Sequence, residues 1–505
     1  MKEIASSPSA PRNDLRRDES RVTSHESRSV WREECGVVGV WSAQGPAAPI
    51  LHLGLYSLQH RGQESAGIAT GDGPRVHLHK GMGLVSQVFD PERIASLKGY
   101  LGVGHVRYST MGSARLENAQ PLLVSSPWGP LALAHNGNLI NAPQLRTELE
   151  AAGVTFSSTT DSEVIAQLIA RAPAGLVEEA VAYCMRRIEG AYTVTVMVGG
   201  CILGFRAAHA IRPLVLGCAD RTWMLASERC AFDHVGAEFV RDVEPGELVV
   251  LDERGAVAHQ VLAVERRAHC VFEYIYFARP DTVLAGRNVH VTRRRMGRIL
   301  AREQPVNADL VIAAPDSGTS AAMGFAEASA LPFEMGLVKN RYIHRTFIQP
   351  DPAVRDFGVR LKLNPLREVI EGRRVVLVDD SIVRGTTSGK IVRMLRAGGA
   401  VEVHMRVSSP PIRFPCFYGI DTSSRGQLVA STHSVEEIRQ MISADSLGYL
   451  SQAGLVEALQ LSREQLCMAC LDGHYPTAVP HEETAGRFAL EGERQGVLAG
   501  TDAHE

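Results

Sequence analysis

The sequence has little of what marks a membrane, secreted or nucleic-acid-binding protein. No apolar run reaches the roughly 18 residues that a helix needs to cross a bilayer. Lysine and arginine number 53 against 56 aspartates and glutamates, so the basic excess that favours nucleic-acid binding is missing. The one basic cluster, residues 293–295, is typical of a helix face or a subunit contact. Nine cysteines in 505 residues are too few for a disulfide scaffold and indicate a reducing, cytoplasmic setting.

The two ends of the chain differ in composition from its middle. Residues 1–34 hold seven basic and seven acidic residues with almost no apolar clustering, and they lack the apolar region of a secretory signal. A segment of this kind buries too little apolar surface to offset its ordering entropy. We therefore predict a disordered leader at 1–34 and a weakly structured tail at 478–505.

The chain between these ends changes its pattern once. Over residues 35–262, short strand-like runs are separated by Gly, Pro and Asn, with helical patterns at 144–152 and 162–170. This predicts stacked antiparallel sheets flanked by helices. A Gly-Gly pair divides the apolar run 191–205, which predicts a β-hairpin there. Over residues 263–477, strand, Gly-rich loop and helix alternate, which predicts a parallel α/β sheet.

A phosphate-binding loop is predicted in the second half. The apolar run 375–378 is followed by Asp379 and Asp380, at the strand end where α/β sheets bind ligands. Residues 384–389 (RGTTSG) then offer hydroxyls and backbone N–H groups at the start of a helix, which suits a phosphate dianion better than it suits a solvated turn. The stretch is not a Walker loop. It resembles the ribose-phosphate loop of type I phosphoribosyltransferases, which bind phosphoribosyl pyrophosphate (PRPP).

This resemblance implies specific roles. The two acids would contact ribose hydroxyls and Mg²⁺, with Ser317 as a further Mg²⁺ ligand, and the hydroxyl loop would hold the 5′-phosphate. Residues 316–320 resemble the pyrophosphate loop, and residues 339–347 resemble the mobile loop that closes over it. The implied PRPP-binding residues are Lys339, Arg341, Asp379, Asp380, Ser381, Arg384, Gly385, Thr386, Thr387 and Ser388.

A second catalytic set is predicted in the first half. Cys35 begins the first strand-like run, where a lone cysteine is most often a small buried side chain. Polar loops at 58–70, 104–110 and 134–141, together with 159–165, are similar to those of class II, N-terminal-nucleophile (Ntn) glutamine amidotransferases. The resemblance implies an α+β Ntn hydrolase sandwich of antiparallel sheets with helices. An α/β type I phosphoribosyltransferase domain with a parallel sheet would follow it.

The resemblance also makes Cys35 the nucleophile. If the leader is removed between Glu34 and Cys35, the new α-amino group has a pKa near 8 and can act as the base for the thiol. We therefore expect autocatalytic cleavage at that bond. The other implied residues each have an ordinary alternative interpretation: Asn136 and Gly137 as a turn, Arg107 as a surface cation, and Asp161 as a helix N-cap. By resemblance, Asn136 and Gly137 form the oxyanion hole, Arg107 holds the glutamine α-carboxylate, and Asp161 holds its α-ammonium group.

Cysteines of the second half have the spacing of a metal site. Cys467 and Cys470 form a CxxC, which alone fits zinc, a redox disulfide or an iron–sulfur cluster. With two distant thiols, an all-sulfur set suits Zn²⁺ or an iron–sulfur centre. One branch of the glutamine PRPP amidotransferases carries a [4Fe–4S] cluster on a similar set. The resemblance thus implies a cluster on Cys270, Cys416, Cys467 and Cys470, and we expect Cys184, Cys201, Cys218 and Cys230 in the core.

Taken together, the two halves resemble the glutamine PRPP amidotransferase family. The implied reaction is the first committed step of purine biosynthesis: glutamine, PRPP and water give 5-phospho-β-D-ribosylamine, glutamate and diphosphate. Ammonia would pass from the glutaminase site to the PRPP site. The family implies feedback inhibition by purine nucleotides and a homo-oligomer, either dimer or tetramer. Two alternatives stay open, namely a class II amidotransferase with another acceptor and a PRPP-sensing regulator.

Overall fold

The computed structural model describes residues 35–108, 112–264, 266–340, 363–420, 422, 425–480 and 490. The predicted leader, most of the predicted tail, and Arg341 with most of the predicted mobile loop lie outside these residues. None of the helices in the described ranges is long and apolar enough to span a membrane.

A seven-stranded antiparallel sheet contains the strand that follows Cys35. Its order is β11-β9-β10-β1-β4-β2-β3. Strand β1 (Gly36–Ser42) lies at the centre and is buried along its whole length, which explains its nearly continuous apolar sequence. The other strands are β2 (Ser65–Gly71), β3 (Val76–Met82), β4 (Leu101–Arg107), β9 (Val215–Ala219), β10 (Thr222–Ala226) and β11 (Glu238–Asp242).

A second antiparallel sheet has the order β13-β12-β8-β7-β6-β5. Strands β7 (Gly190–Val198) and β8 (Cys201–Arg206) form the predicted hairpin. Gly199 and Gly200 connect them with φ of +57° and +88°, values that a two-residue turn requires and that glycine adopts without strain. The remaining strands are β5 (Leu122–Ser126), β6 (Gly129–Leu139), β12 (Glu247–Asp252) and β13 (Gly255–Gln260).

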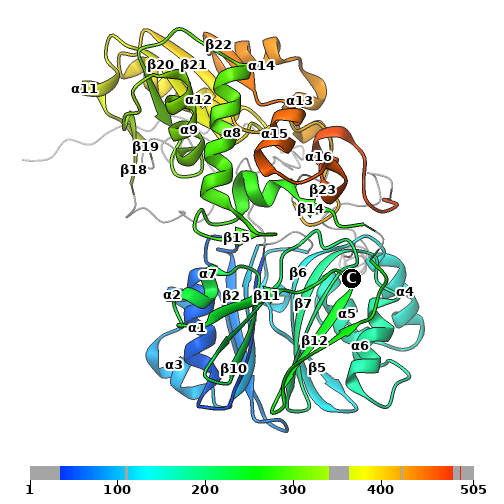
Figure 1. Ribbon diagram of the computed structural model, residues 1–505. Coiled ribbons are helices and arrows are strands. Elements are labelled where there is room, and N and C mark those ends of the chain that lie inside the picture. Colours follow the sequence, from blue (N-terminus) through cyan, green and yellow to red (C-terminus); the bar gives the residue numbers. More distant parts are fainter. Residues whose placement is uncertain are drawn as a thin grey trace, which may run out of the picture. The chain divides into compact units, whose positions relative to one another are not determined.

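Helices cover the outer faces of both sheets, as Figure 1 shows. Helix α1 (Ala47–Ser57) packs on the first sheet, and α5 (Asp161–Ala170) and α6 (Val177–Met185) pack on the second. A third layer of apolar side chains fills the space between the sheets. The predicted sandwich is therefore confirmed. Four further helices are α2 (Val85–Val88), α3 (Pro91–Ser96), α4 (Ala142–Ala151) and α7 (Cys230–Asp233).

Helices α1 and α6 are not predicted from the sequence, for a physical reason. Helix α1 is preceded by Pro46, and α6 by Leu176, so neither has a Ser, Thr, Asp or Asn at its N-cap position, although the Glu179 carboxylate accepts a hydrogen bond from the Leu176 N–H. Helix α1 is also apolar around much of its circumference, so the alternation of apolar and polar faces that identifies a surface helix is weak.

The second half contains a four-stranded parallel sheet, as predicted. Its order is β17-β20-β21-β22, and all three neighbouring pairs are parallel. Val376 and Val378 of β20 pack toward helices α8 and α9, whereas Val375 and Leu377 pack toward α12 and α14. Because both faces are covered, the four central residues of the strand, 375–378, are all apolar. The bounds are β17 (Leu310–Ala313), β20 (Arg374–Asp379), β21 (Glu402–Val407), β22 (Ser446–Tyr449), α8 (Val289–Glu303), α9 (Thr319–Ser329), α12 (Thr386–Ala397) and α14 (Val435–Ile442).

Short elements complete this half. Strand β14 (His269–Cys270) pairs in parallel with β23 (Leu466–Cys467), which sets Cys270 opposite Cys467. A single π-type turn, η2 (Glu273–Phe277), follows β14. The others are β15 (Val283–Leu284), β16 (Arg287–Asn288), β18 (Leu337–Lys339), β19 (Leu363–Pro365), α11 (Arg367–Ile370), α13 (Val429–Thr432), α15 (Gln452–Leu459), α16 (Ala469–Asp472), η3 (Arg425–Gln427) and η4 (Arg463–Gln465). The first half has one further short turn, η1 (Leu116–Asn118).

Candidate functional site

Cys35 is buried at the residue that precedes β1. Its thiol donates a hydrogen bond to the Tyr108 carbonyl at 3.3 Å, and its own carbonyl accepts one from Arg61 Nε at 3.0 Å. Burial raises the pKa of the Cys35 thiol to about 11, although the nearby Arg107 guanidinium opposes this. The thiol is therefore protonated at neutral pH and needs a base before it can act as a nucleophile.

Asn136 and Gly137 lie on β6, a strand of the second sheet. The Asn136 side chain is buried, and its Nδ2 has no hydrogen-bond partner among the described residues. Gly137 has a φ of +143°, and a Cβ at this position would lie 1.9 Å from the Ala191 carbonyl oxygen. Only glycine fits there. A buried amide donor without a partner is costly, so Asn136 is available for an anion that binds beside it.

Arg107 and Asp161 are both buried charged residues. Arg107 ends β4 and forms an ion pair with Glu64. Asp161 is the first residue of α5, and its Oδ2 accepts a hydrogen bond from the Leu139 N–H at 3.0 Å. The helix-cap reading of Asp161 is wrong, because Thr160 occupies the cap position. The Asp161 carboxylate instead connects the helix to β6.

Strand pairing brings these residues to one region. Gly36 of β1 lies opposite Val106 of β4, so Cys35 is adjacent to the end of β4. Strands β4 and β6 belong to different sheets and are joined by a hydrogen-bond contact of 3.0 Å between His105 Nε2 and the His135 carbonyl. The charges of both Arg107 and Asp161 act on the pKa of Cys35. The first half thus gathers a thiol, a guanidinium and a carboxylate, with the Asn136 amide on the strand that Asp161 contacts.

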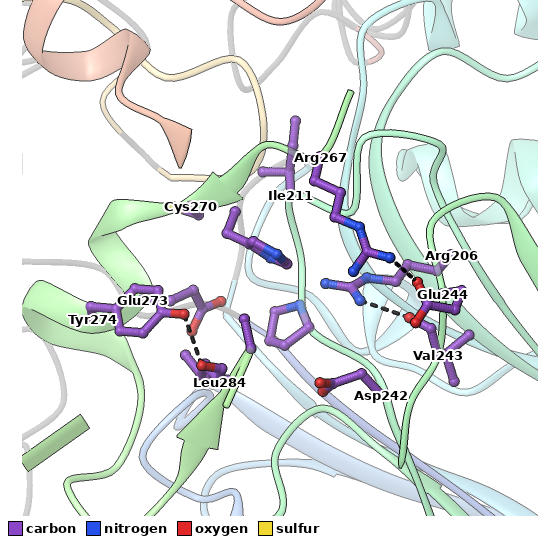
Figure 2. A pocket seen from close by; sticks show the side chains of 13 residues that line it. Arg206, Ile211, Asp242, Val243, Glu244, Arg267, Cys270, Glu273, Tyr274 and Leu284 are labelled. Atoms are coloured by element: carbon purple, nitrogen blue, oxygen red, sulfur yellow. Dashed lines mark hydrogen bonds and ion pairs between the residues drawn. The ribbon is translucent and has the colours of Figure 1, made fainter. Parts of the chain in front are cut away.

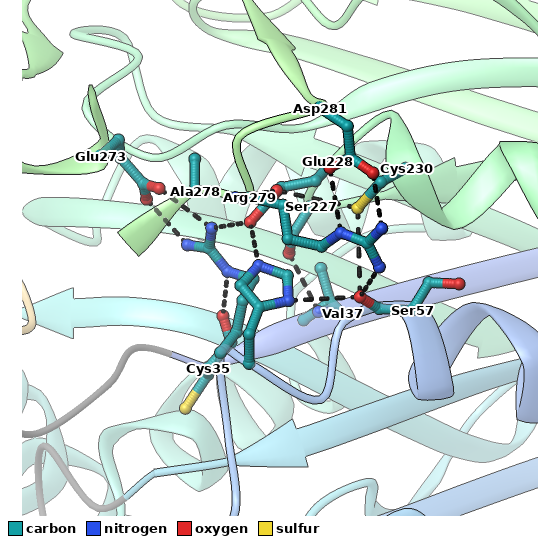
Figure 3. Close-up of polar contacts among 12 residues, drawn as sticks. Cys35, Val37, Ser57, Ser227, Glu228, Cys230, Glu273, Ala278, Arg279 and Asp281 are labelled. Atoms are coloured by element: carbon teal, nitrogen blue, oxygen red, sulfur yellow. Dashed lines mark hydrogen bonds and ion pairs between the residues drawn. The ribbon is translucent and has the colours of Figure 1, made fainter. Parts of the chain in front are cut away.

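A buried ion network behind Cys35 was not predicted from the sequence (Figure 3). Arg61 donates to Glu228 Oε1 at 2.6 Å and to Glu273 Oε1 at 2.7 Å. Burial by itself raises the pKa of Glu228, but His60 and Arg61 outweigh it and lower the value to about 2. Arg61 lies in the predicted loop 58–70. Its partners are 167 and 212 residues away in sequence, so only the folded chain reveals them.

Two adjacent acids lie at the C-terminal end of β20, where Asp379 is the last strand residue and Asp380 follows it. Asp380 is buried and accepts hydrogen bonds from the Ser317 and Ser381 hydroxyls. Asp379 Oδ1 accepts one from the Asp380 N–H at 2.9 Å. Burial raises the pKa of both carboxyls, and the charge of Asp380 raises that of Asp379 further. Such a pair is stabilised by a bound cation, and Ser317 supplies a neighbouring oxygen.

The predicted phosphate loop ends at the N-terminus of α12. Gly385 precedes the helix with a φ of +73°, which lets the chain turn sharply into it. Thr386 and Thr387 are exposed there, and Ser388 is buried. Arg384 Nη2 donates to Gln427 Oε1 at 2.5 Å. The loop therefore offers hydroxyls at the positive end of a helix.

The predicted pyrophosphate loop approaches the same strand end. A Cβ on Gly318 would lie 2.5 Å from the Val378 carbonyl oxygen, so glycine allows the loop to sit against β20. Lys339, the last residue of β18, donates to Asp316 Oδ2 at 2.6 Å. The structure therefore places Lys339 at the pyrophosphate loop, whereas Arg341 lies outside the described residues.

Arg293 differs from its predicted role at a helix surface. Its side chain is buried and donates to the Tyr274 carbonyl at 2.7 Å and to the Ala278 carbonyl at 2.9 Å. Burial lowers the pKa of Arg293 to about 10, and the negative charge of Asp380 opposes this shift. Arg293 thus joins η2 to the region of the acid pair. The sequence did not predict this burial, because Arg293 stands in a run of three arginines that is typical of an exposed helix face.

The four cysteines predicted to bind a cluster lie in adjoining segments. Cys270 faces Cys467 across the β14–β23 pair. Burial, together with the nearby Cys416, raises the pKa of Cys467 to about 12. Burial also raises the pKa of Cys470 strongly, with further effects from Cys416 and Cys467. The Cys416 Sγ accepts a hydrogen bond from the Tyr418 N–H at 3.4 Å.

Buried thiols that disfavour each other's charge suit a shared metal centre. Within the described ranges, however, no three His, Cys, Asp or Glu side chains gather around the position of a single metal ion. An all-sulfur donor set of this kind suits either Zn²⁺ or an iron–sulfur centre.

A small cavity lies beside Cys270 and Glu273 (Figure 2). Its volume of about 40 Å³ has room for a few water molecules. Arg206 and Arg267 line it, and Arg206 Nη1 donates to the Val243 carbonyl at 2.7 Å. Apart from Cys270, none of the predicted site residues lines this cavity, so it is distinct from both predicted substrate sites.

Comparison with known proteins agrees with the two halves. Residues 105–234 match the family model of a glutamine amidotransferase domain. The amidophosphoribosyltransferase of Synechococcus elongatus is 50% identical over 469 residues, which cover 91% of this chain and 94% of that protein. The Bacillus subtilis amidophosphoribosyltransferase is 48% identical over 452 residues, which cover 88% of this chain and 95% of that protein.

Two solved structures are similar over most of the chain. One is glutamine PRPP amidotransferase from B. subtilis complexed with ADP and GMP, with a TM-score of 0.84, 48% identity, and coverage of 88% of this chain and 98% of that one. The other is an allosteric regulatory enzyme of purine biosynthesis, with a TM-score of 0.85, 47% identity, and coverage of 90% and 99%.

The fold and the sites define a class of protein: an Ntn-type glutamine amidotransferase sandwich joined to a phosphoribosyltransferase-type parallel sheet. The identity and coverage make the assignment more specific. The chain belongs to the amidophosphoribosyltransferase family, the glycosyltransferases of purine biosynthesis. The predicted family, fold class and activity are thereby confirmed, and they are favoured over another acceptor or a regulator.

Proposed function

We propose that this chain converts glutamine, PRPP and water into 5-phospho-β-D-ribosylamine, glutamate and diphosphate. Ammonia released at the glutaminase site would pass to the PRPP site. One observation carries the proposal. The chain holds both a buried thiol in the region of an amide donor that has no partner among the described residues and an acid pair in front of a hydroxyl-rich helix start. The first set suits amide cleavage, and the second suits a ribose phosphate.

Glutamine cleavage begins with Cys35. With a pKa of about 11, the thiol is a weak nucleophile until a base takes its proton. Cleavage between Glu34 and Cys35 would free the α-amino group of Cys35, the residue that carries the sulfur. That amine can accept the proton of the thiol. Attack on the amide then releases ammonia, and water hydrolyses the thioester to glutamate.

Four buried groups would hold glutamine and its tetrahedral intermediate. Asn136 Nδ2, which has no hydrogen-bond partner among the described residues, would donate to the oxyanion, and the Gly137 N–H is the second donor that the family resemblance implies. Arg107, which also pairs with Glu64, would bind the substrate α-carboxylate, and Asp161 would bind the α-ammonium group.

PRPP would bind across the ends of β17 and β20. Asp379 and Asp380 would contact the ribose hydroxyls, and Ser381 with residues 384–388 would hold the 5′-phosphate. Mg²⁺ would be held by Asp379, Asp380 and Ser317, where it supplies positive charge for the diphosphate. Lys339 and Arg341 would add cations for the leaving group. Lys339 would first exchange its Asp316 partner for the diphosphate.

A [4Fe–4S] cluster would be held by Cys270, Cys416, Cys467 and Cys470. The pairing of β14 with β23 and the mutual effects on the thiol pKa values support this set. Neither half-reaction transfers electrons, so the cluster would not act in catalysis. Iron and sulfide analysis of anaerobically purified protein tests it: about four irons per chain are expected, and a zinc-only protein would overturn it.

Further proposals concern organisation and control. The B. subtilis structure complexed with ADP and GMP supports purine nucleotides as feedback inhibitors of this chain. We also propose a cytoplasmic homo-oligomer, either dimer or tetramer. The domains would be a propeptide at 1–34, the amidotransferase at 35–262, the phosphoribosyltransferase at 263–477 and a tail at 478–505.

The function is tested by inactivating each of the two proposed sites in turn. Cys35→Ser should abolish glutamine-dependent formation of phosphoribosylamine and leave the ammonia-dependent reaction intact. Asp380→Asn should impair both. If Cys35→Ser keeps glutamine-dependent synthesis, the proposed nucleophile is wrong. If Asp380→Asn leaves both reactions unchanged, the proposed PRPP site is wrong.

A further inference from the structure

One segment of the second half lies directly against the strand that carries the proposed oxyanion donors. Asn138 follows Asn136 and Gly137 on β6, and its Nδ2 donates a hydrogen bond to the Phe417 carbonyl at 2.9 Å. The two residues are 279 positions apart in sequence. The segment 416–420 therefore contacts the oxyanion strand two residues from the buried amide of Asn136.

The contact is close at the level of the backbone. Gly419 has a φ of +110°, and a Cβ there would lie 3.2 Å from the Gly137 carbonyl carbon. The same Cβ would lie 3.1 Å from Arg212 Nη2. The positive φ favours glycine at position 419, and a side chain there would require Gly137 or Arg212 to shift by a few tenths of an ångström.

Arg212 holds the segment from a second direction. The side chain is fully buried, and its Nε and Nη2 both donate to the Tyr418 carbonyl, at 3.0 and 2.6 Å. Its Nη1 lies 3.6 Å from Glu273 Oε1, the carboxylate that also binds Arg61. The carbonyls of two consecutive residues, Phe417 and Tyr418, are thus bound by side chains of the amidotransferase half.

We propose that Asn138 and Arg212 are positioning residues of the glutaminase. By fixing segment 416–420 against β6, they hold the Gly137 N–H and the Asn136 amide in the geometry that the oxyanion requires. This inference rests on the proposed oxyanion role of Asn136 and Gly137. Oxyanion donors act only within a narrow range of distance, so a small shift of β6 lowers the rate. The second half thereby completes the glutaminase site without contacting glutamine.

Asn138→Asp is the most direct variant, because it keeps the size of the side chain and removes the donor to Phe417. Arg212→Lys keeps the charge beside Glu273 and removes the forked contact with Tyr418. Asn141→Asp is the matched control. Asn141 also donates from Nδ2 to a backbone carbonyl, that of Arg187 at 2.9 Å, but both partners lie within the amidotransferase half.

Three quantities are measured on the full chain: kcat and KM with glutamine, the ammonia-dependent rate, and the affinity for glutamate γ-semialdehyde. This aldehyde forms a hemithioacetal with Cys35, and its oxyanion probes the same donors. We expect kcat with glutamine and the aldehyde affinity to fall about three- to tenfold in both variants, the range for one neutral hydrogen bond. The glutamine KM, the ammonia-dependent rate and all Asn141→Asp values should stay within twofold.

The possible outcomes distinguish failure of the positioning role from failure of the proposed oxyanion site. Asn136→Ala, measured alongside, reports on the oxyanion site itself. If Asn136→Ala loses activity while Asn138→Asp and Arg212→Lys do not, positioning is refuted and the oxyanion site stands. Equal losses of glutamine- and ammonia-dependent rates in the Asn138 and Arg212 variants would also refute it, because they indicate general destabilisation. Unchanged rates in all three variants would overturn both the oxyanion site and its positioning.

Discussion

Replacing Asn136 by alanine tests the proposed glutaminase site most sharply. In the resting protein the Asn136 amide is buried, and its Nδ2 has no hydrogen-bond partner within the described residues. A buried donor left unpaired costs about 1–3 kcal/mol, and this cost is present before glutamine binds. When the oxyanion forms, the donor gains a charge-assisted hydrogen bond. The interaction therefore favours the transition state over the ground state.

The expected loss follows from that difference. Removal of one oxyanion donor typically lowers kcat by about 10²–10³-fold, or about 2.7–4 kcal/mol. We expect Asn136→Ala to fall in this range for glutaminase kcat. The KM for glutamine should change little, because in the proposed site the α-substituents would be bound by Arg107 and Asp161 instead. The substitution should not destabilise the fold through lost hydrogen bonding, since Nδ2 has no partner among the described residues.

Steady-state glutaminase kinetics and the ammonia-dependent reaction should be measured on the same preparation. Asn136→Asp is a useful companion, because a carboxylate of the same size repels the oxyanion and should be at least as inactive. A kcat for Asn136→Ala within about threefold of the parent would refute the oxyanion assignment. A parallel loss of the ammonia-dependent rate would indicate that the fold, rather than the glutaminase step, was damaged.

Three other predictions follow from the same structure. Intact-mass analysis of active protein should show a chain that begins at Cys35. Full glutaminase activity with the leader still attached would exclude the α-amino group of Cys35 as the base. The pKa of Glu228 is lowered from 4.5 to about 2, so its ion pairs stabilise the fold above pH 4.5 by about 3 kcal/mol and lose this effect as the pH falls toward 2. The difference in urea midpoint between parent and Glu228→Gln should therefore narrow between pH 4.5 and 2, and a constant difference would contradict the ion network. Asp379→Asn should raise the KM for PRPP at least tenfold with glutaminase kcat at saturating PRPP unchanged, and an unaltered PRPP KM would count against the site.

The phosphate-binding chemistry of the second half could be predicted from the sequence because its determinants are local, whereas the glutaminase residues, spread over residues 35–161, were predicted through the family resemblance. The acids Asp379 and Asp380, the apolar strand before them and the hydroxyl loop after them occupy one short stretch, and the structure arranges them as strand, loop and helix. The Gly199–Gly200 hairpin was equally predictable, because a two-residue turn needs positive φ at both positions. Helices α1 and α6 were not predicted because neither has a Ser, Thr, Asp or Asn at its N-cap position, which is the usual local signal for the start of a helix.

The contacts that connect the halves were decided by tertiary structure alone. Arg61 meets Glu273 across 212 residues, and Asn138 meets Phe417 across 279. Arg293 looked like part of a basic surface, yet it is buried against the backbone of η2. Composition and periodicity report the environment of a segment, not which distant segment it meets. The sequence by itself therefore determined the two chemistries, while only the folded chain determined how the glutaminase strand is held by the half that binds PRPP.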